Sequence, residues 1–229
     1  MIDLKKSKLA RLTNDSLDEF WSERHHIIKY QFGLHLNQYA TGKMFDYNHK
    51  LNLSNEQRQT AIESYRKTHR SSSISKQFQR LLIGYYGVRG LTPKKVNLSS
   101  KIANSIKNPK KCTSDHIIGV TLCSEYVIQI FRQKMSLRIF NTINEPEDPF
   151  KNLKDDSIYR EVINEMCNDW LKDHLWLWAM CRVTKKEHSP ANGGIRRDYE
   201  FKDDLTLEIK YRANLGHYDD AGVEIQHYD

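Results

Sequence analysis

Apolar positions along this chain recur mostly three and four residues apart, which is the spacing of one helix face. The longest example lies within residues 155–182, where Ile158, Val162, Met166 and Trp170 follow one another at steps of four. This wide apolar face predicts a central core helix. The same spacing predicts further helices over residues 16–30, 54–69, 74–83 and 121–135, and a short helix from Ser99 or Ser100 to Lys107.

Local sequence signals predict where some of these helices begin and where a loop separates them. Ser54 and Gln57 match a capping box, in which a hydroxyl and an amide three residues later satisfy each other's backbone groups. Residues 31–53 contain Gly33, Gly42 and several asparagines, and this composition predicts a loop.

Two segments favour strands. Residues 199–201 and 205–211 alternate between apolar and polar side chains, which predicts a hairpin. Residues 117–130 are rich in β-branched side chains, so a hairpin stays open as the alternative to a helix there. We therefore expect an α+β fold, a mainly helical single domain over residues 1–229 with a small C-terminal β-hairpin.

The composition excludes several classes of protein. With 229 residues, 38% hydrophobic and 28% charged, the chain is long and apolar enough to bury one core. No apolar run approaches the roughly 18 residues that span a membrane, and the N-terminus lacks the apolar segment of a signal peptide. The four cysteines form no C-x-x-C pair. We expect a cytoplasmic protein without a membrane partner.

Positive charge is concentrated in one stretch. Residues 64–114 contain 12 Lys or Arg and no Asp or Glu, whereas the whole chain carries a net charge of +7, so the rest sums to −5. A segregated basic surface attracts polyanions, and glycine-flanked tyrosines can stack on bases. Nucleic acid is therefore the expected partner, DNA ahead of RNA. The predicted binding residues are Arg66, Lys67, Arg70, Lys76, Arg80, Tyr85, Tyr86, Arg89, Lys94, Lys95, Lys101, Lys107, Lys110 and Lys111.

The basic stretch ends at Thr113-Ser114-Asp115-His116, a compact polar cluster. The sequence Asp115-His116-Ile117-Ile118-Gly119 resembles the opening of the HNH (ββα-metal) nucleases. This resemblance implies His116 as the general base and Asp115 as a ligand of Mg²⁺ or another divalent metal. The alternative is that Ser114 or Asp115 caps a helix and His116 lies in its first turn.

A second candidate site lies near the C-terminus. Asp198, followed by Glu208 and Lys210 on the predicted strand, is similar to the PD-(D/E)XK nuclease signature, in which carboxylates hold Mg²⁺ and a lysine orients water. Solvated charges on an edge hairpin are the alternative interpretation.

Within the single domain we expect a helical core at residues 115–182 and a C-terminal hairpin and tail at residues 195–229. A third resemblance covers the C-terminal half of the chain. Thr113-Ser114-Asp115-His116, Val183-Thr184-Lys185-Lys186-Glu187-His188 and Ala221-Gly222-Val223 resemble uncharacterised proteins of tailed phages. This resemblance implies a viral or mobile-element origin and suggests that Asp115, His116, Glu187 and His188 meet as a metal or acid–base cluster.

These patterns together predict a nucleic-acid-binding protein, specifically a metal-dependent endonuclease of phage or restriction type. The competing class is a non-catalytic DNA- or RNA-binding regulator. A third class is a phage inhibitor or virion protein that binds an acidic partner. A second copy of the chain and a host protein are the further expected partners.

Overall fold

The computed structural model describes residues 14–41, 54, 56–57, 60, 98–144, 147–151, 156–188 and 204–227. Every structural statement below concerns these residues. The predicted helix over residues 74–83, the strand at residues 199–201 and most of the basic stretch lie outside them.

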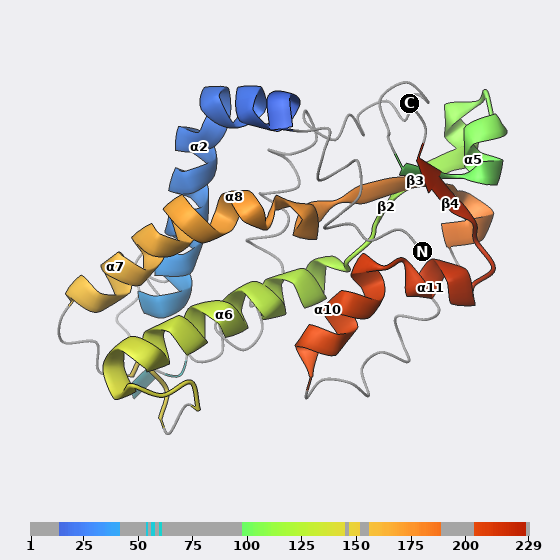
Figure 1. Cartoon of the computed structure of the whole chain (residues 1–229). Coiled ribbons are helices and arrows are strands. Elements are labelled where there is room, and N and C mark those ends of the chain that lie inside the picture. The colour runs from blue at the N-terminus through green and yellow to red at the C-terminus, as the bar shows by residue number, and fades with distance from the viewer. Residues whose placement is uncertain are drawn as a thin grey trace.

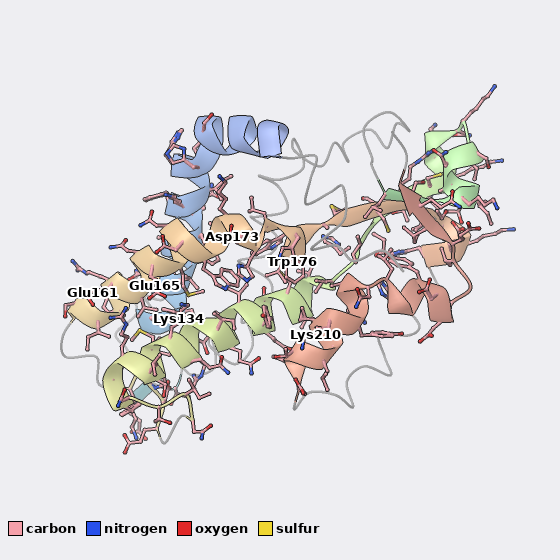
Figure 2. All side chains as sticks on the ribbon, in the orientation of Figure 1. Lys134, Glu161, Glu165, Asp173, Trp176 and Lys210 are labelled. Carbon is pink, nitrogen blue, oxygen red and sulfur yellow. The ribbon has the colours of Figure 1, made fainter. Side chains whose placement is uncertain are left out.

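Long helices form one side of the molecule. They are α2 (Asn14–Thr41), α6 (Val120–Phe140) and a continuous helical segment made of α7 (Asp156–Glu165), a π-helical turn (Met166–Trp170) and α8 (Leu171–Asp173). In Figure 1 the segment from α7 to α8 runs beside α6, and α2 crosses it. The ion pair between Lys134 of α6 and Glu165 of α7 joins two of these helices (Figure 2).

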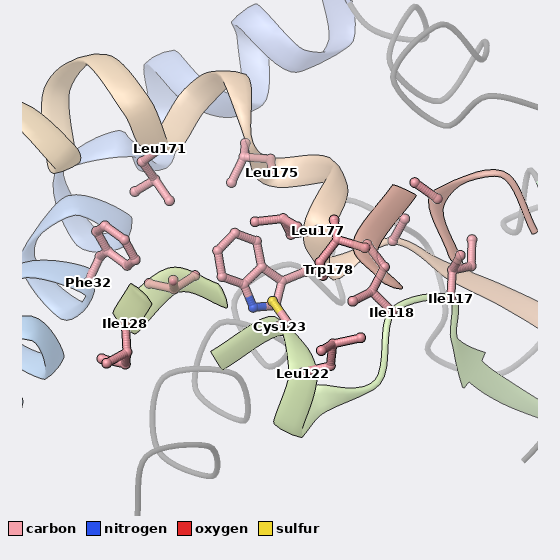
Figure 3. Packing of buried hydrophobic residues seen from close by; sticks show 14 of the residues in the cluster. Phe32, Ile117, Ile118, Leu122, Cys123, Ile128, Leu171, Leu175, Leu177 and Trp178 are labelled. Atoms are coloured by element: carbon pink, nitrogen blue, oxygen red, sulfur yellow. The ribbon is translucent and has the colours of Figure 1, made fainter. Parts of the chain in front are cut away.

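The core lies between these helices and continues towards the sheet. Phe32 of α2 and Ile128 of α6 are almost fully buried, and Trp178 lies in the middle of the same cluster (Figure 3). Burying side chains of this size contributes roughly 1.5–3 kcal/mol each. The neighbours labelled with them in Figure 3 are Ile117, Ile118, Leu122, Cys123, Leu171, Leu175 and Leu177.

A four-stranded mixed sheet forms the other side of the molecule. Its strands are β1 (Leu98–Ser100), β2 (Cys112–His116), β3 (Met180–Thr184) and β4 (Ile225–His227), in the order β2-β3-β1-β4. β3 pairs antiparallel with β2 and parallel with β1, and β1 pairs antiparallel with β4. The sheet therefore joins segments from the middle and the end of the chain.

Short helices surround this sheet. They are α5 (Lys101–Ser105), the 3₁₀ turns at Pro109–Lys111 and Leu175–Trp178, α10 (Leu205–Ala213) and α11 (Gly216–Asp220). In Figure 1 α5 lies at the far end of the sheet, and α10 lies between the sheet and α6. None of the helices that the structure describes combines the length and the apolar character needed to cross a membrane.

The expected fold class is confirmed at the level of an α+β, mostly helical protein, but the predicted C-terminal hairpin is wrong. Residues 205–213 form a helix, because the Asp204 carboxylate accepts hydrogen bonds from the backbone N–H groups of Thr206 and Leu207, both at 3.2 Å. This N-cap outweighs the alternating pattern of the segment. The strands come instead from four separate parts of the chain.

The loop expected at residues 31–53 is wrong over residues 31–41, where α2 continues. Gly33 lies within this helix and faces α7 and the π-helical segment. A Cβ atom at Gly33 would lie 3.4 Å from Cys167 Sγ and 3.4 Å from Ile163 Cγ2, which is ordinary van der Waals contact. Packing of α2 against this segment therefore overrides the low helix propensity of the glycine.

The other helix predictions that fall on described residues hold with changed ends, whereas the helix predicted over residues 54–69 lies mostly outside them. Residues 121–135 are helical as expected, so the alternative hairpin is wrong. Ser100 caps α5 by accepting a hydrogen bond from the Ala103 N–H at 3.0 Å, and Gln57 N–H bonds Ser54 Oγ at 3.2 Å as the capping box predicts. The helix expected over residues 155–182 ends early, because residues 180–184 pair with two strands as β3.

Candidate acid–base site

A buried carboxylate and a half-exposed histidine meet at the edge of the sheet. Asp115 lies on β2 with only 6% of its surface exposed. His188 lies in a helical turn that directly follows β3, and residues 185–188 of this turn are described. Asp115 Oδ1 lies 3.3 Å from His188 Nδ1, and the His188 side chain is 39% exposed. The sequence suggested that these two residues meet, and the structure places them in contact.

The second carboxylate oxygen of Asp115 also has a partner within the protein. The Tyr218 hydroxyl, on α11, donates a hydrogen bond to Asp115 Oδ2 at 2.8 Å, and the Cys181 thiol donates to the Tyr218 oxygen at 3.0 Å. Burial raises the pKa of the Tyr218 hydroxyl well above its ordinary value, and burial also raises the pKa of the Cys181 thiol. Both groups therefore stay protonated at neutral pH, and they hold the carboxylate in a fixed orientation.

Glu187 has a structural role at the start of the helical turn. Its Oε2 accepts hydrogen bonds from the Ser100 hydroxyl at 2.7 Å and from the Thr184 N–H at 2.8 Å. The Glu187 N–H in turn donates to Thr184 Oγ1 at 3.1 Å. This reciprocal pair is a capping box, and it fixes the turn that carries His188.

His116 points away from the Asp115 pair. Adjacent residues on a strand face opposite sides of the sheet, so Asp115 and His116 cannot share one face. Burial lowers the pKa of His116; the nearby Asp115 charge opposes this shift, and His188 adds to it. His116 is therefore neutral at pH 7, and His188 lies close enough to influence its titration.

Lysines flank the Asp115–His188 pair. Lys185 and Lys186 lie on the turn that carries His188, and Lys110 and Lys111 directly precede β2; all four are exposed. Because Cys112 pairs with Thr184, the lysines of both segments lie at the same end of the strand pair. This arrangement places positive charge next to His188.

Only part of the predicted basic surface is described. Lys101 forms an ion pair with Glu224 at 3.4 Å, so a carboxylate from elsewhere in the chain partly neutralises it. Lys107, Lys110 and Lys111 are exposed, and no described carboxylate forms an ion pair with them. The other predicted binding residues lie outside the described part of the chain: Arg66, Lys67, Arg70, Lys76, Arg80, Tyr85, Tyr86, Arg89, Lys94 and Lys95.

The second candidate site is not assembled as predicted. Asp198 lies outside the described residues, and Glu208 and Lys210 lie on a helix rather than on a strand. Residues two apart on a helix point about 200° apart, so the two side chains do not share a face. Glu208 instead bonds the Arg212 guanidinium at 3.3 Å, and Lys210 is exposed on α10 (Figure 2).

Two of the residues predicted to bind a metal, Asp115 and Glu187, have partners within the protein. Both oxygens of Asp115 have partners within the protein, and Glu187 Oε2 is used in the capping box. Within the described residues no three His, Cys, Asp or Glu side chains converge as a metal site. A divalent cation therefore stays a prediction from the sequence.

Three residues of this site were not found from the sequence. Tyr218 lies 103 residues from Asp115, and no local pattern links them. Lys185 and Lys186 were overlooked as binding residues, although their position directly before Glu187-His188 was a usable signal.

Comparison with known proteins returned no match to a family model, a curated protein or a solved structure. The fold and the site by themselves define an α+β protein with a carboxylate–histidine pair at the edge of a mixed sheet. Its function must be inferred from that pair and its surroundings.

Proposed function

We propose that this protein binds nucleic acid and cleaves its phosphodiester backbone by general acid–base chemistry, with His188 as the base. The observation that carries the proposal is the contact between the buried Asp115 carboxylate and Nδ1 of the half-exposed His188. Surrounding lysines supply the attraction for phosphate. The proposal assigns the base to His188 rather than His116, because His188 is the histidine that the carboxylate contacts.

The pair supports base catalysis for a physical reason. When Nδ1–H donates to the carboxylate, the lone pair of the neutral imidazole lies on Nε2. The buried carboxylate then stabilises the imidazolium that forms once Nε2 has taken a proton. Tyr218 keeps the carboxylate oriented, so it acts as a positioning residue.

A histidine base of this kind suits RNA. His188 takes the proton of a 2′-hydroxyl, the 2′-oxygen attacks phosphorus, and the 5′-oxygen leaves with a proton from solvent. No metal takes part in these steps. DNA lacks the internal nucleophile, so its cleavage requires an activated water instead.

The second candidate is the metal-dependent endonuclease that the HNH resemblance implies. It is favoured by the proximity of Asp115 to His188, which neighbours Glu187, since all three are residue types that bind divalent metals. It requires the carboxylates to exchange their present partners for a cation.

The decisive experiment is to incubate the full chain with labelled RNA and DNA in EDTA, in Mg²⁺ and in Mn²⁺. We expect RNA cleavage in EDTA with 2′,3′-cyclic phosphate ends. His188→Gln should lower the rate by about 10²–10⁴-fold while leaving RNA binding intact. Asp115→Asn should lower it comparably, and Tyr218→Phe by a smaller factor. His26→Gln, at an exposed histidine on α2, is the matched control.

Three outcomes distinguish the possibilities. Cleavage that needs Mg²⁺ or Mn²⁺ identifies the metal-dependent enzyme. Salt-sensitive binding without cleavage under any condition identifies a non-catalytic binding protein. Undiminished cleavage by His188→Gln removes the assigned base.

A further inference from the structure

A groove lies on the helical side of the molecule, where α2 crosses the segment from α7 to α8 (Figure 1). Its volume is about 490 Å³, which is typical of a site for a small ligand. Ile163 and Cys167 are buried, and together with Gly33 they form an apolar floor. The sheet that carries the Asp115–His188 pair lies on the other side of the molecule, so the groove is a separate feature.

Side-chain amides provide hydrogen-bonding groups along one wall of this groove. Asn164 and Asn168 are exposed, and both line the groove. The Lys29 ammonium donates a hydrogen bond to Asn168 Oδ1 at 2.7 Å. Because an ammonium group has only donors, this bond fixes the amide with its NH₂ group on the other side. The wall therefore offers a donor from Asn168 and a donor next to an acceptor from Asn164.

An aromatic ring borders the groove on the side of α2. Tyr30 is 71% exposed, and it lines the groove near Leu34, which is 39% exposed. A single exposed tyrosine needs no explanation, but this ring faces a groove whose other helix carries amide groups. An aromatic ring and planar hydrogen-bonding groups are the combination that proteins use to hold unpaired nucleobases.

The backbone of the amide wall also departs from a regular helix. Cys167 and Asn168 belong to the π-helical turn Met166–Trp170, and Asn164 lies in the last turn of α7 before it. A π-helical turn inserted into an α-helix changes the direction of the side chains that it carries, and such turns are frequent at functional sites. The irregular turn therefore points to the same groove independently of its polar lining.

We propose that this groove binds an unpaired nucleobase, adenine in preference to uracil, stacked on Tyr30 and bonded by Asn164 and Asn168. An asparagine amide matches adenine, because its oxygen accepts from the N6 amino group while its NH₂ group donates to N7. The proposal rests on the nucleic-acid binding proposed above but not on cleavage. It makes single-stranded RNA the substrate class, since a base inside a duplex is stacked and paired and cannot enter the groove.

The test measures the binding of labelled 2′-O-methyl hexanucleotides to the full chain by fluorescence anisotropy. The 2′-O-methyl group removes the nucleophile of the proposed cleavage, so the ligand stays intact. One hexanucleotide carries adenine at every position, and its control is abasic at every position with the same phosphates. We expect the adenine form to bind about tenfold more tightly than the abasic form. It should also bind about fivefold more tightly than the uracil form, and Asn164→Leu should remove this second difference.

Two groove variants and one control locate the binding site. Tyr30→Ala should remove most of the preference for adenine over the abasic form, whereas Leu207→Ala, at a 57% exposed residue of α10, should keep it. Gly33→Ala adds a methyl group to the groove floor, 3.4 Å from Cys167 Sγ and from Ile163 Cγ2. Because alanine favours a helix, the Tm of this variant should equal or exceed that of the wild type, while its affinity for the adenine form falls about fivefold. A damaged fold would lower both quantities.

Equal affinity of the wild type for the adenine and abasic forms would overturn the proposal, because phosphate contacts alone would then account for the binding. The proposed nucleic-acid binding would stand in that case. The groove is equally ruled out if Tyr30→Ala and Gly33→Ala both keep the preference for adenine, because the base would then bind elsewhere. Failure of the wild type to bind any of the hexanucleotides would contradict nucleic-acid binding itself, and both proposals with it.

Discussion

The buried histidine of α11 offers a quantitative test of the structure. His217 is only 4% exposed, and its ring lies 4.0 Å from the ring of Tyr218, centroid to centroid. Both ring nitrogens are without a hydrogen-bond partner among the described residues. Burial, together with the nearby charge of Arg212, lowers the pKa of His217 from 6.5 to about 3. We predict that this residue makes the protein sensitive to mild acid.

The direction and size of the effect follow from proton linkage. The folded state binds the proton less tightly than the unfolded state, so His217 favours folding above pH 6.5, and this contribution is lost as the pH falls towards 3. Between about pH 7.5 and pH 5 the loss amounts to roughly 2 kcal/mol, and the full difference in pKa corresponds to roughly 5 kcal/mol. These values are of the order of a quarter or more of the stability of a typical domain.

The assay is urea unfolding of the wild type and His217→Phe at about pH 7.5 and about pH 5. The phenylalanine ring keeps most of the packing and does not titrate. We expect the wild type to lose roughly 2 kcal/mol more than the variant between the two pH values. The pKa of His116 is also lowered by burial and shifts stability in the same direction, but it is present in both proteins and cancels.

His26→Gln, at an exposed histidine, controls for the loss of a histidine as such and should keep the pH dependence of the wild type. Equal pH dependence in the wild type and His217→Phe would refute the reasoning. It would mean that His217 titrates normally, and therefore that α11 does not bury it.

Three further predictions concern local features of the fold. Asp204→Ala removes the N-cap of α10 and should lower the free energy of unfolding by about 1 kcal/mol in urea titrations; an unchanged midpoint would contradict the cap. Gly216→Ala should cost about 1–2 kcal/mol, because its Cβ would lie 2.4 Å from a ring carbon of Tyr211, whereas Gly119→Ala, with no atom within 4 Å, should be nearly neutral; equal Tm values for the two variants would contradict this packing. All four cysteines are buried, and burial raises the pKa of Cys167 to about 12, so a thiol reagent at pH 8 should label the native protein far more slowly than the unfolded chain; rapid native labelling would show that the core opens readily.

The sequence by itself determined most of the helices that the structure describes. A helix depends on contacts between residues three and four positions apart, so its apolar face and its caps are visible locally. The helix over residues 121–135 and the Ser100 cap of α5 were found in this way. The overestimated length of the 155–182 helix has the same origin, since its apolar pattern continues into β3, where a buried strand is equally apolar.

The sheet was decided only by the tertiary structure. Its strands are three to five residues long, too short to show a convincing alternation. Their partners lie far away in the chain, as in the pairing of Leu98 with His227. Each strand is held by backbone hydrogen bonds and by burial on assembly, and neither leaves a strong signature in a short stretch of sequence.

In the candidate site, too, the sequence indicated some of the residues and only the tertiary structure identified the others. The sequence singled out Asp115 at the end of the basic stretch, and the resemblance to tailed-phage proteins suggested His188 as its neighbour. It did not find Tyr218, which reaches Asp115 only because α11 packs on the sheet. It also did not show which histidine contacts the carboxylate, because that depends on the side of the strand each residue faces and on where the next turn places His188. The residue types of the site can be read in the sequence, whereas long-range packing sets the distances between their side chains.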